Sequence, residues 1–237
     1  WRPDVVHAHD WRAAWAGQSL ATMCAVPLVS TFHSTESGRH GGNVPDGDSA
    51  SIHSVESWIA NTSHRVICCS RFMQREVIDG FELMPDQVQL IPNGVDVSEW
   101  APLGDQQRSM LVFAWGRVQY EKGFQVLAQA IGRLRGRVPG IRCVIAGRGP
   151  YLPELQSQVD IEGVSDLVHL AGYVSDEELR SLLHEAGCVV IPSLYEPFGI
   201  VALESLAANA PTIVARTGGL AEIMEGTEAS LMFEPGN

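Results

Sequence analysis

The sequence of 237 residues has a composition typical of globular proteins, with 45% hydrophobic and 19% charged residues, and is long enough for one large domain or two small ones. Its formal net charge of −12 argues against a general nucleic-acid-binding protein, so an anionic ligand would have to be attracted by local cations. The sequence has no run of about 18 apolar residues that would predict a membrane span. The five cysteines show neither metal-ligand spacing nor a disulfide framework, which favours a reducing, cytoplasmic environment.

Short apolar runs alternate with helical patterns in the first half of the chain, which predicts parallel strands joined by helices. A strand from Asp4 to His9 is followed by Asp10 in the position of a helix N-cap. The next strand runs from Val26 to Phe32 and leads into His33. Polar residues at the carboxyl end of a parallel strand face the crevice where open α/β sheets bind ligands, so His33 is a candidate ligand contact. The alternative is a structural histidine.

A loop rich in glycine and polar residues is predicted from Gly38 to Ser49. Its Asp46-Gly47-Asp48 tripeptide has the Asp-x-Asp form of a known metal motif, but no strand leads directly into it. We therefore interpret it as a solvated loop and predict no metal site. The next predicted elements are a helix from Ile52 to Asn61, a strand from Arg65 to Cys69, a helix that Ser70 caps and Gly80 ends, and a strand from Val88 to Ile91.

The segment after these elements predicts a linker and a phosphate-binding turn. Composition places the linker between residues 98 and 108. The following strand, Met110 to Trp115, leads through Gly116 into a turn with Arg117 and Lys122, and then into a helix from Val126 to Leu134. Arginine binds phosphate in a fork and lysine acts as a point charge, so this arrangement suits a phosphate group. Two surface cations beside a turn are the alternative.

The remaining elements continue the alternation of strand and helix. The strand from Ile141 to Ala146 ends in a Gly147-Arg148-Gly149-Pro150 turn, which lacks the third glycine of a dinucleotide fingerprint. Ser175 and Glu178 form a capping-box pattern at the start of the helix from Asp176 to His184. Four strands complete the prediction: Leu167 to Leu170, Cys188 to Ile191, Thr212 to Ala215 and Ala229 to Phe233.

The most informative stretch is IPSLYEPFGIVALESL, from Ile191 to Leu206. From about Gly199 it predicts a helix that is apolar almost all round, and such helices are usually buried. Glu204 lies within that helix and needs a partner, whereas Glu196 precedes it. The first N–H groups of a helix, with a glycine beside them, form an anion site between the two acids. The alternative is a buried helix with a salt-bridged Glu204 and a solvated Glu196.

This pattern of two glutamates with seven residues between them, and Pro-Phe-Gly-Ile after the first, resembles the retaining nucleotide-sugar glycosyltransferases of the GT-B fold, in particular the glycogen and starch synthase group. The Gly-Arg…Lys-Gly segment at Gly116 to Gly123 and the PDVVHAHDW string near the N-terminus carry the same resemblance, which covers nearly the whole chain. It implies an α/β protein of two Rossmann-like, doubly wound parallel-sheet domains with the active site in the cleft. We expect the acceptor-side domain at residues 1–97, the linker at 98–108 and the nucleotide-sugar-binding domain at 109–237. The family's glycine-rich N-terminal loop would lie before Trp1, so we expect a chain truncated at both ends.

The resemblance also assigns roles to residues. Glu196 and His33 would contact the donor sugar, Arg117 and Lys122 would hold the diphosphate, and these four form the expected catalytic set. Glu204 would hold the ribose hydroxyls. The expected donor-binding set is Arg117, Lys122, Phe198, Gly199, Ile200, Glu204 and Gly147.

The implied function is a retaining, metal-independent hexosyltransferase that needs no cofactor. It would move glucose from ADP- or UDP-glucose to a glucan or another carbohydrate acceptor. Two alternatives stay open: a mannosyl- or sucrose-type transferase of the same fold, and a nucleotide-sugar-binding module without turnover. The sequence identifies neither the base, the acceptor, the linkage nor the oligomeric state.

Overall fold

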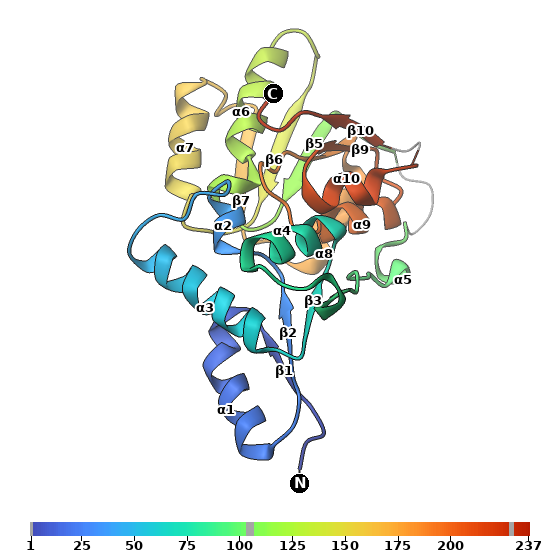
Figure 1. The fold of residues 1–237 in the computed structure, drawn as a ribbon. Coiled ribbons are helices and arrows are strands. Elements are labelled where there is room, and N and C mark those ends of the chain that lie inside the picture. The colour runs from blue at the N-terminus through green and yellow to red at the C-terminus, as the bar shows by residue number, and fades with distance from the viewer. Residues whose placement is uncertain (1, 103–106, 228–229) are drawn as a thin grey trace. The chain divides into compact units, whose positions relative to one another are not determined.

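The computed structural model describes residues 2–102, 107–227 and 230–237. The chain folds into two compact units, the first ending at Asn93 and the second beginning at Gly94 (Figure 1). Each unit is built on a parallel sheet, which confirms the predicted α/β class. Of the predicted linker, residues 103–106 lie outside the described residues, and its first part is not extended but forms helix α5 (Val97–Trp100).

Unit 1 contains a four-stranded parallel sheet in the order β1-β2-β3-β4. The apolar faces of its helices pack against the strands, and Phe32, Ile59 and Met73 are among the fully buried side chains. The strands are β1 (Val6–His9), β2 (Leu28–Phe32), β3 (Arg65–Cys68) and β4 (Val88–Leu90), and the helices are α1 (Ala14–Cys24), α2 (Glu36–Arg39), α3 (Asp48–Thr62) and α4 (Arg71–Phe81), with 3₁₀ turns at Trp11–Ala13 and Pro85–Gln87.

The predicted loop from Gly38 to Ser49 is wrong at both of its ends. Helix α2 extends to Arg39, because the Thr35 side chain caps it by accepting a hydrogen bond from the Gly38 N–H at 2.9 Å. Helix α3 begins at Asp48, where a carboxylate in the first turn is stabilised by the helix dipole. The Asp-x-Asp tripeptide is therefore half loop and half helix.

Helix α4 begins as predicted and ends later than predicted. The Ser70 hydroxyl accepts a hydrogen bond from the Met73 N–H at 3.0 Å, which confirms the predicted cap. The helix does not stop at Gly80, however, but continues to Phe81, whose ring is buried in the core. Glu82 instead takes the left-handed conformation that ends the helix, with φ of 55°.

Unit 2 contains a six-stranded parallel sheet in the order β10-β9-β8-β5-β6-β7. The predicted bounds of β8 and β9 are confirmed, and the other strands begin within two residues of their predicted starts. The strands are β5 (Leu111–Trp115), β6 (Arg142–Ala146), β7 (Val168–Gly172), β8 (Cys188–Ile191), β9 (Thr212–Ala215) and β10 (Ser230–Phe233), and the helices after α5 are α6 (Phe124–Leu134), α7 (Leu152–Ile161), α8 (Asp176–Glu185), α9 (Ile200–Ala207) and α10 (Gly218–Met224), with a 3₁₀ turn at Tyr120–Lys122.

Two apolar layers cover the two faces of this sheet. Helices α6 and α7 pack on one face, against the β5 side chains of Val112 and Ala114. Helices α8, α9 and α10 pack on the other face, where β5 contributes Leu111, Phe113 and Trp115. This alternation along β5 follows from the two-residue period of a strand, and the two helix layers are visible on either side of the sheet in Figure 1.

The strand order of unit 2 reverses direction next to β5. From β5 the chain adds β6 and β7 on one side and then returns to place β8 on the other side, followed by β9 and β10. The carboxyl ends of β5 and β8 thus lie at a topological switch point, where open α/β sheets bind their ligands. The turns after these two strands are the segments that the sequence selected.

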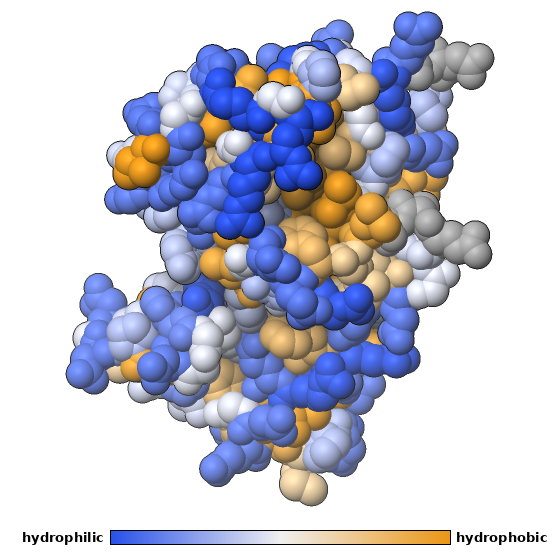
Figure 2. All heavy atoms as spheres, turned by 90° about the horizontal axis from the view of Figure 1, so that it is seen from above, coloured by the Kyte–Doolittle hydropathy of each residue, from blue (hydrophilic) through white to orange (hydrophobic). Residues whose placement is uncertain are grey.

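The surface combines hydrophilic and apolar areas (Figure 2). Figure 2 shows a face on which hydrophilic residues predominate, with smaller apolar areas between them. Within the described part of the chain, no helix is both long enough and apolar enough to cross a bilayer.

Candidate functional site

The turns after β5 and β8 are joined through their backbones. The N–H groups of Leu194 and Tyr195 both donate to the Glu121 carbonyl oxygen, at 2.8 and 3.3 Å. Gly123 has φ of 70°, and a Cβ added there would lie 1.9 Å from the Pro192 carbonyl oxygen. Because only glycine permits this approach, the backbone itself sets the distance between the two turns.

This contact brings together two of the predicted catalytic residues. The Lys122 ammonium lies 2.8 Å from Glu196 Oε2, with only 20% and 12% of the two side chains exposed. The fully buried Ser193 hydroxyl donates to the same oxygen at 3.1 Å. Within the described residues, Glu196 Oε1 accepts no hydrogen bond, so it is the carboxylate oxygen left for a ligand.

Arg117 lies on the same turn as Lys122 and is exposed. Its side chain makes no hydrogen bond or ion pair with any described residue, so its guanidinium is an uncommitted cation at this edge of the sheet. The two predicted cations therefore differ: one is fixed by an ion pair, and the other is available to bind an anion in a fork.

Gly147, a predicted donor-binding residue, holds the turn after β6 against the turn after β5. Its φ is 142°, and a Cβ there would lie 1.8 Å from the Gly116 carbonyl oxygen. A Cβ on Gly149 would likewise lie 2.0 Å from the Val118 carbonyl oxygen. These glycines are required by close backbone packing, which places the β6 turn directly beside the segment that carries Arg117.

Helix α9 starts without a side-chain cap. Its N-cap, Gly199, has φ of 99°. The Ala202 N–H donates to the Gly199 carbonyl oxygen at 2.9 Å, whereas the N–H groups of Ile200 and Val201 have no hydrogen bond with any described residue. The preceding Phe198 packs its backbone against Gly219, where a Cβ would lie 2.4 Å from the Phe198 Cα. Ile200 is 42% exposed, and only Ala202 and Ser205 of α9 are buried, so the prediction that this apolar helix is buried is wrong for most of its length. The Gly219 N–H donates to the Glu196 carbonyl oxygen at 2.9 Å, which ties α10 to the same turn.

Glu204 has a neutral partner rather than a cation. The Trp115 side chain, at the carboxyl end of β5, donates a hydrogen bond to the Glu204 carboxylate. Burial raises the pKa of Glu204, and this hydrogen bond opposes the rise. The predicted need for a partner is confirmed, but the alternative of a salt-bridged Glu204 is not found among the described residues. Ser193 and Trp115 are the neighbours that sequence reasoning missed. The position of Trp115, at the end of the strand before the Gly116 turn, could have indicated it.

His33 belongs to unit 1, whereas the other predicted site residues belong to unit 2. It is exposed and directly follows β2, as predicted. Its Nε2 lies 3.0 Å from His9 Nδ1, and the two rings are stacked with centroids 5.3 Å apart. Its backbone N–H donates to Asp10 Oδ1 at 2.9 Å.

Asp10 occupies the N-cap position of the 3₁₀ turn at Trp11–Ala13, as predicted, but its side chain does not cap that turn. Asp10 makes no side-chain cap hydrogen bond and has φ of 55°. Its carboxylate turns instead toward the neighbouring strand and holds the His33 N–H. The sequence could not show this, because the two residues are brought together only when β1 pairs with β2.

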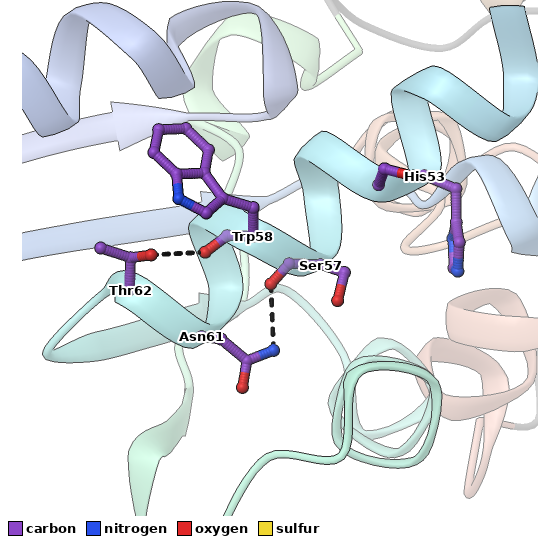
Figure 3. Close-up of a pocket in the computed structure, with 6 residues that line it drawn as sticks. His53, Ser57, Trp58, Asn61 and Thr62 are labelled. Carbon is purple, nitrogen blue, oxygen red and sulfur yellow. Dashed lines mark hydrogen bonds between the residues drawn. The ribbon is translucent and has the colours of Figure 1, made fainter.

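A groove of about 500 Å³ lies elsewhere in unit 1, along α3 (Figure 3). The predicted site residues are absent from its lining, which is His53, Ser54, Ser57, Trp58, Asn61 and Thr62. Two of its polar groups are engaged within the helix: the Asn61 amide donates to the Ser57 carbonyl oxygen at 3.0 Å, and the Thr62 hydroxyl to that of Trp58 at 2.7 Å. Across the described ranges, no cluster of three or more His, Cys, Asp or Glu side chains could hold a metal ion.

Comparisons with known proteins identify the family and the fold. The family model described as Glycosyl transferases group 1 matches residues 101–237, and that described as Glycosyltransferase Family 4 matches residues 1–99. The chain is 39% identical over 238 residues to a glycogen synthase of Mycobacterium tuberculosis, covering 99% of this chain and 57% of that protein.

Solved structures show the same fold. The chain superimposes on Anabaena HepE in complex with UDP and glucose with a TM-score of 0.85 at 22% identity, covering 99% of this chain and 65% of that one. It superimposes on sucrose-phosphate synthase from Thermosynechococcus elongatus with a TM-score of 0.82 at 23% identity, covering 99% and 61%. Because the first family model alone matches more than half of the sequence, the chain belongs to the glycosyl transferases group 1 family and has the GT-B fold.

Proposed function

We propose that the protein transfers glucose from ADP- or UDP-glucose to a glucan, with retention of the anomeric configuration and without a metal ion. The observation that carries the proposal is the Lys122–Glu196 pair at the switch point of unit 2, with the uncommitted Arg117 on the same turn and the open start of α9 beside it. The 39% identity to a glycogen synthase supports glucose and a glucan as substrates. The chain spans 57% of that relative's length, so this activity is proposed for the protein as a whole.

The chemistry breaks an anomeric C–O bond to a diphosphate, and its largest need is stabilisation of the charge that develops on the leaving phosphate. We assign that task to Arg117, Lys122 and the first N–H groups of α9. Glu196 Oε1 then faces the sugar, because Oε2 is held by Lys122 and Ser193. With no nucleophile and base paired at this edge among the described residues, the proposal is same-face attack assisted by the leaving phosphate.

Glu204 and His33 complete the proposed donor site. The half-buried Glu204 would accept hydrogen bonds from the ribose hydroxyls, with Trp115 fixing the carboxylate that does so. His33 would contact the donor sugar from unit 1. For the environment we propose the cytoplasm, because the described residues form no disulfide from the five cysteines.

A donor-panel assay on the full-length protein tests this function. ADP-, UDP- and GDP-sugars are supplied with a maltooligosaccharide acceptor, and the anomeric configuration of the product is read by NMR. We expect α-linked glucose from ADP- or UDP-glucose. Mannose transfer from GDP-mannose would replace the sugar assignment, and no transfer from any donor would favour a binding module without turnover.

The phosphate assignment is tested by single substitutions. Arg117→Ala and Lys122→Ala should each lower kcat/KM a hundredfold or more, which is about 3 kcal/mol of transition-state stabilisation. Arg133→Ala removes an exposed cation from the last turn of α6 and is the matched control, with an expected rate within about twofold of wild type. Wild-type rates in both test variants would refute the assignment.

A further inference from the structure

Unit 1 contains a buried carboxylate that the proposed chemistry does not use. Glu56 lies on α3 with 1% of its surface exposed. Both of its oxygens accept the same backbone N–H, that of Glu36, at 3.1 and 2.9 Å. A buried charge is costly unless it is paired and hydrogen-bonded. The hydrogen bonds from the Glu36 N–H offset part of that cost, which indicates that the carboxylate is needed at this position.

The partner of Glu56 is three residues beyond His33. The segment from His33 to Thr35 is thus anchored at both ends by carboxylates: Asp10 holds the His33 N–H at 2.9 Å, and Glu56 holds the Glu36 N–H. Beyond this segment, α2 is capped by Thr35. The short turn that carries His33 is therefore held by side chains from outside it. Asp10 lies after β1, Glu56 lies on α3, and Glu76 on α4 accepts a hydrogen bond from the Thr35 hydroxyl.

The charges around Glu56 leave it free to titrate while its neighbour stays ionised. Burial raises the pKa of Glu56, the Glu36 N–H and Arg39 oppose the rise, and the charges of Glu36 and Asp10 add to it, so the pKa is about 7. Burial would also raise the pKa of Glu36, but the Ser49 hydroxyl, Arg39 and His40 together lower it.

We propose that Glu56 is a positioning residue: its ionised carboxylate holds the Glu36 N–H and thereby fixes the turn that presents His33 to the sugar donor. When Glu56 takes up a proton, one of its oxygens becomes a donor, and the two-oxygen grip on the N–H is lost. The Glu36 N–H then has one neutral acceptor oxygen in place of two charged ones, so this end of the turn is held more weakly, while Asp10 at the other end is unaffected. This inference rests on the proposed function only through the contact between His33 and the donor.

The first test needs no activity. The amide resonance of Glu36 is followed by ¹⁵N NMR from pH 5.5 to 9 in the full-length wild-type protein and in Glu56→Gln. We expect the wild-type resonance to titrate with a midpoint near 7 and the variant resonance to stay unchanged. A wild-type Glu36 amide that does not titrate, or one that titrates equally in the variant, would overturn the proposal.

The second test separates positioning from a general structural role. The value of kcat/KM is measured against pH for wild type, Glu56→Gln, His33→Ala and the double variant, with Asp79→Asn on α4 as a control that removes an exposed charge. We expect kcat/KM of the wild type to fall about tenfold as the pH drops through 7. Glu56→Gln should have the lower of these two values even at pH 8, and Asp79→Asn should show the same pH dependence as wild type. In the His33→Ala background, Glu56→Gln should change the rate less than about twofold.

Additive effects of the two substitutions would overturn the proposal, because a residue that acts through His33 has nothing to position once His33 is gone. Failure of the proposed function looks different: wild type would then transfer no sugar from any donor, and the Glu36 amide would still titrate with Glu56.

Discussion

The buried carboxylate of Glu56 predicts a measurable dependence of stability on pH. Its pKa is about 7 in the folded chain, against an ordinary value of 4.5. Between those pH values the folded chain retains a proton that the unfolded chain has released. The stability contributed by this group is therefore fully present below pH 4.5, falls as pH rises and is lost above about 7.

The size of the effect follows from the two pKa values. Their difference corresponds to about 3 kcal/mol of unfolding free energy, since one pKa unit is worth about 1.4 kcal/mol. Glutamine keeps the shape of the side chain and does not titrate. The unfolding free energy of wild type, measured relative to that of Glu56→Gln, should therefore drop by about 2–3 kcal/mol between pH 5 and pH 8.

Guanidinium unfolding followed by circular dichroism at both pH values measures this difference, with separate transitions fitted if the two units unfold separately. Asp79→Asn is the control, and its free-energy difference from wild type should change little with pH. The reasoning is refuted if the difference between wild type and Glu56→Gln is the same at pH 5 and pH 8 within about 0.5 kcal/mol.

Three further predictions concern the rest of the chain. Gly123→Ala should destabilise unit 2 by about 2 kcal/mol or more, because the new Cβ would meet a backbone oxygen at 1.9 Å. Gly80→Ala is the control: Gly80 is exposed in a helix with nothing within 4 Å, so the substitution should stabilise unit 1 by about 0.5–1 kcal/mol. If the two substitutions change the unfolding free energy, measured with denaturant, in the same direction and by the same amount, the packing argument is contradicted. Glu204→Gln should weaken calorimetric affinity for the nucleoside diphosphate, whereas Glu196→Gln should lower kcat with that affinity nearly intact; the reverse result would exchange the two roles. Sugar transfer should continue in the presence of a metal chelator, and strict dependence of the rate on Mn²⁺ or Mg²⁺ would contradict the proposed chemistry. Asp48→Ala should lower the unfolding free energy by only about 0.5 kcal/mol, with little change in the transfer rate.

The sequence predicted most strands because their signal is local. Strands β8 and β9 are apolar runs bounded by turn residues, and their bounds were predicted to the residue. Helices α2, α7 and α10 were missed. Helices α2 and α10 begin in glycine- and polar-rich segments that favour loops, and tertiary contacts such as the one between Gly219 and the Glu196 carbonyl decide their form.

The candidate site was only partly predictable for a related reason. Lys122 and Glu196 were selected from separate turns, but the ion pair between them, and the hydroxyl of Ser193 behind it, depend on strand order. Asp10 shows the limit most clearly: its position before a helix predicted a cap, and a residue 23 positions away took its carboxylate instead. Contacts between residues far apart in sequence produce no periodic pattern in the sequence, so they could not be predicted from it.

The contact between the turns after β5 and β8 also constrains the order in which the chain can fold. Lys122 and Glu196 are 74 residues apart, and β6 and β7 lie between them in the sequence. Closing so long a loop costs more entropy than pairing β5 with the next strand, β6. While only β5, β6 and β7 are paired, the β5 turn carries its cations without the acid that fixes one of them, and the proposed donor site is complete only after β8 docks along the open edge of β5.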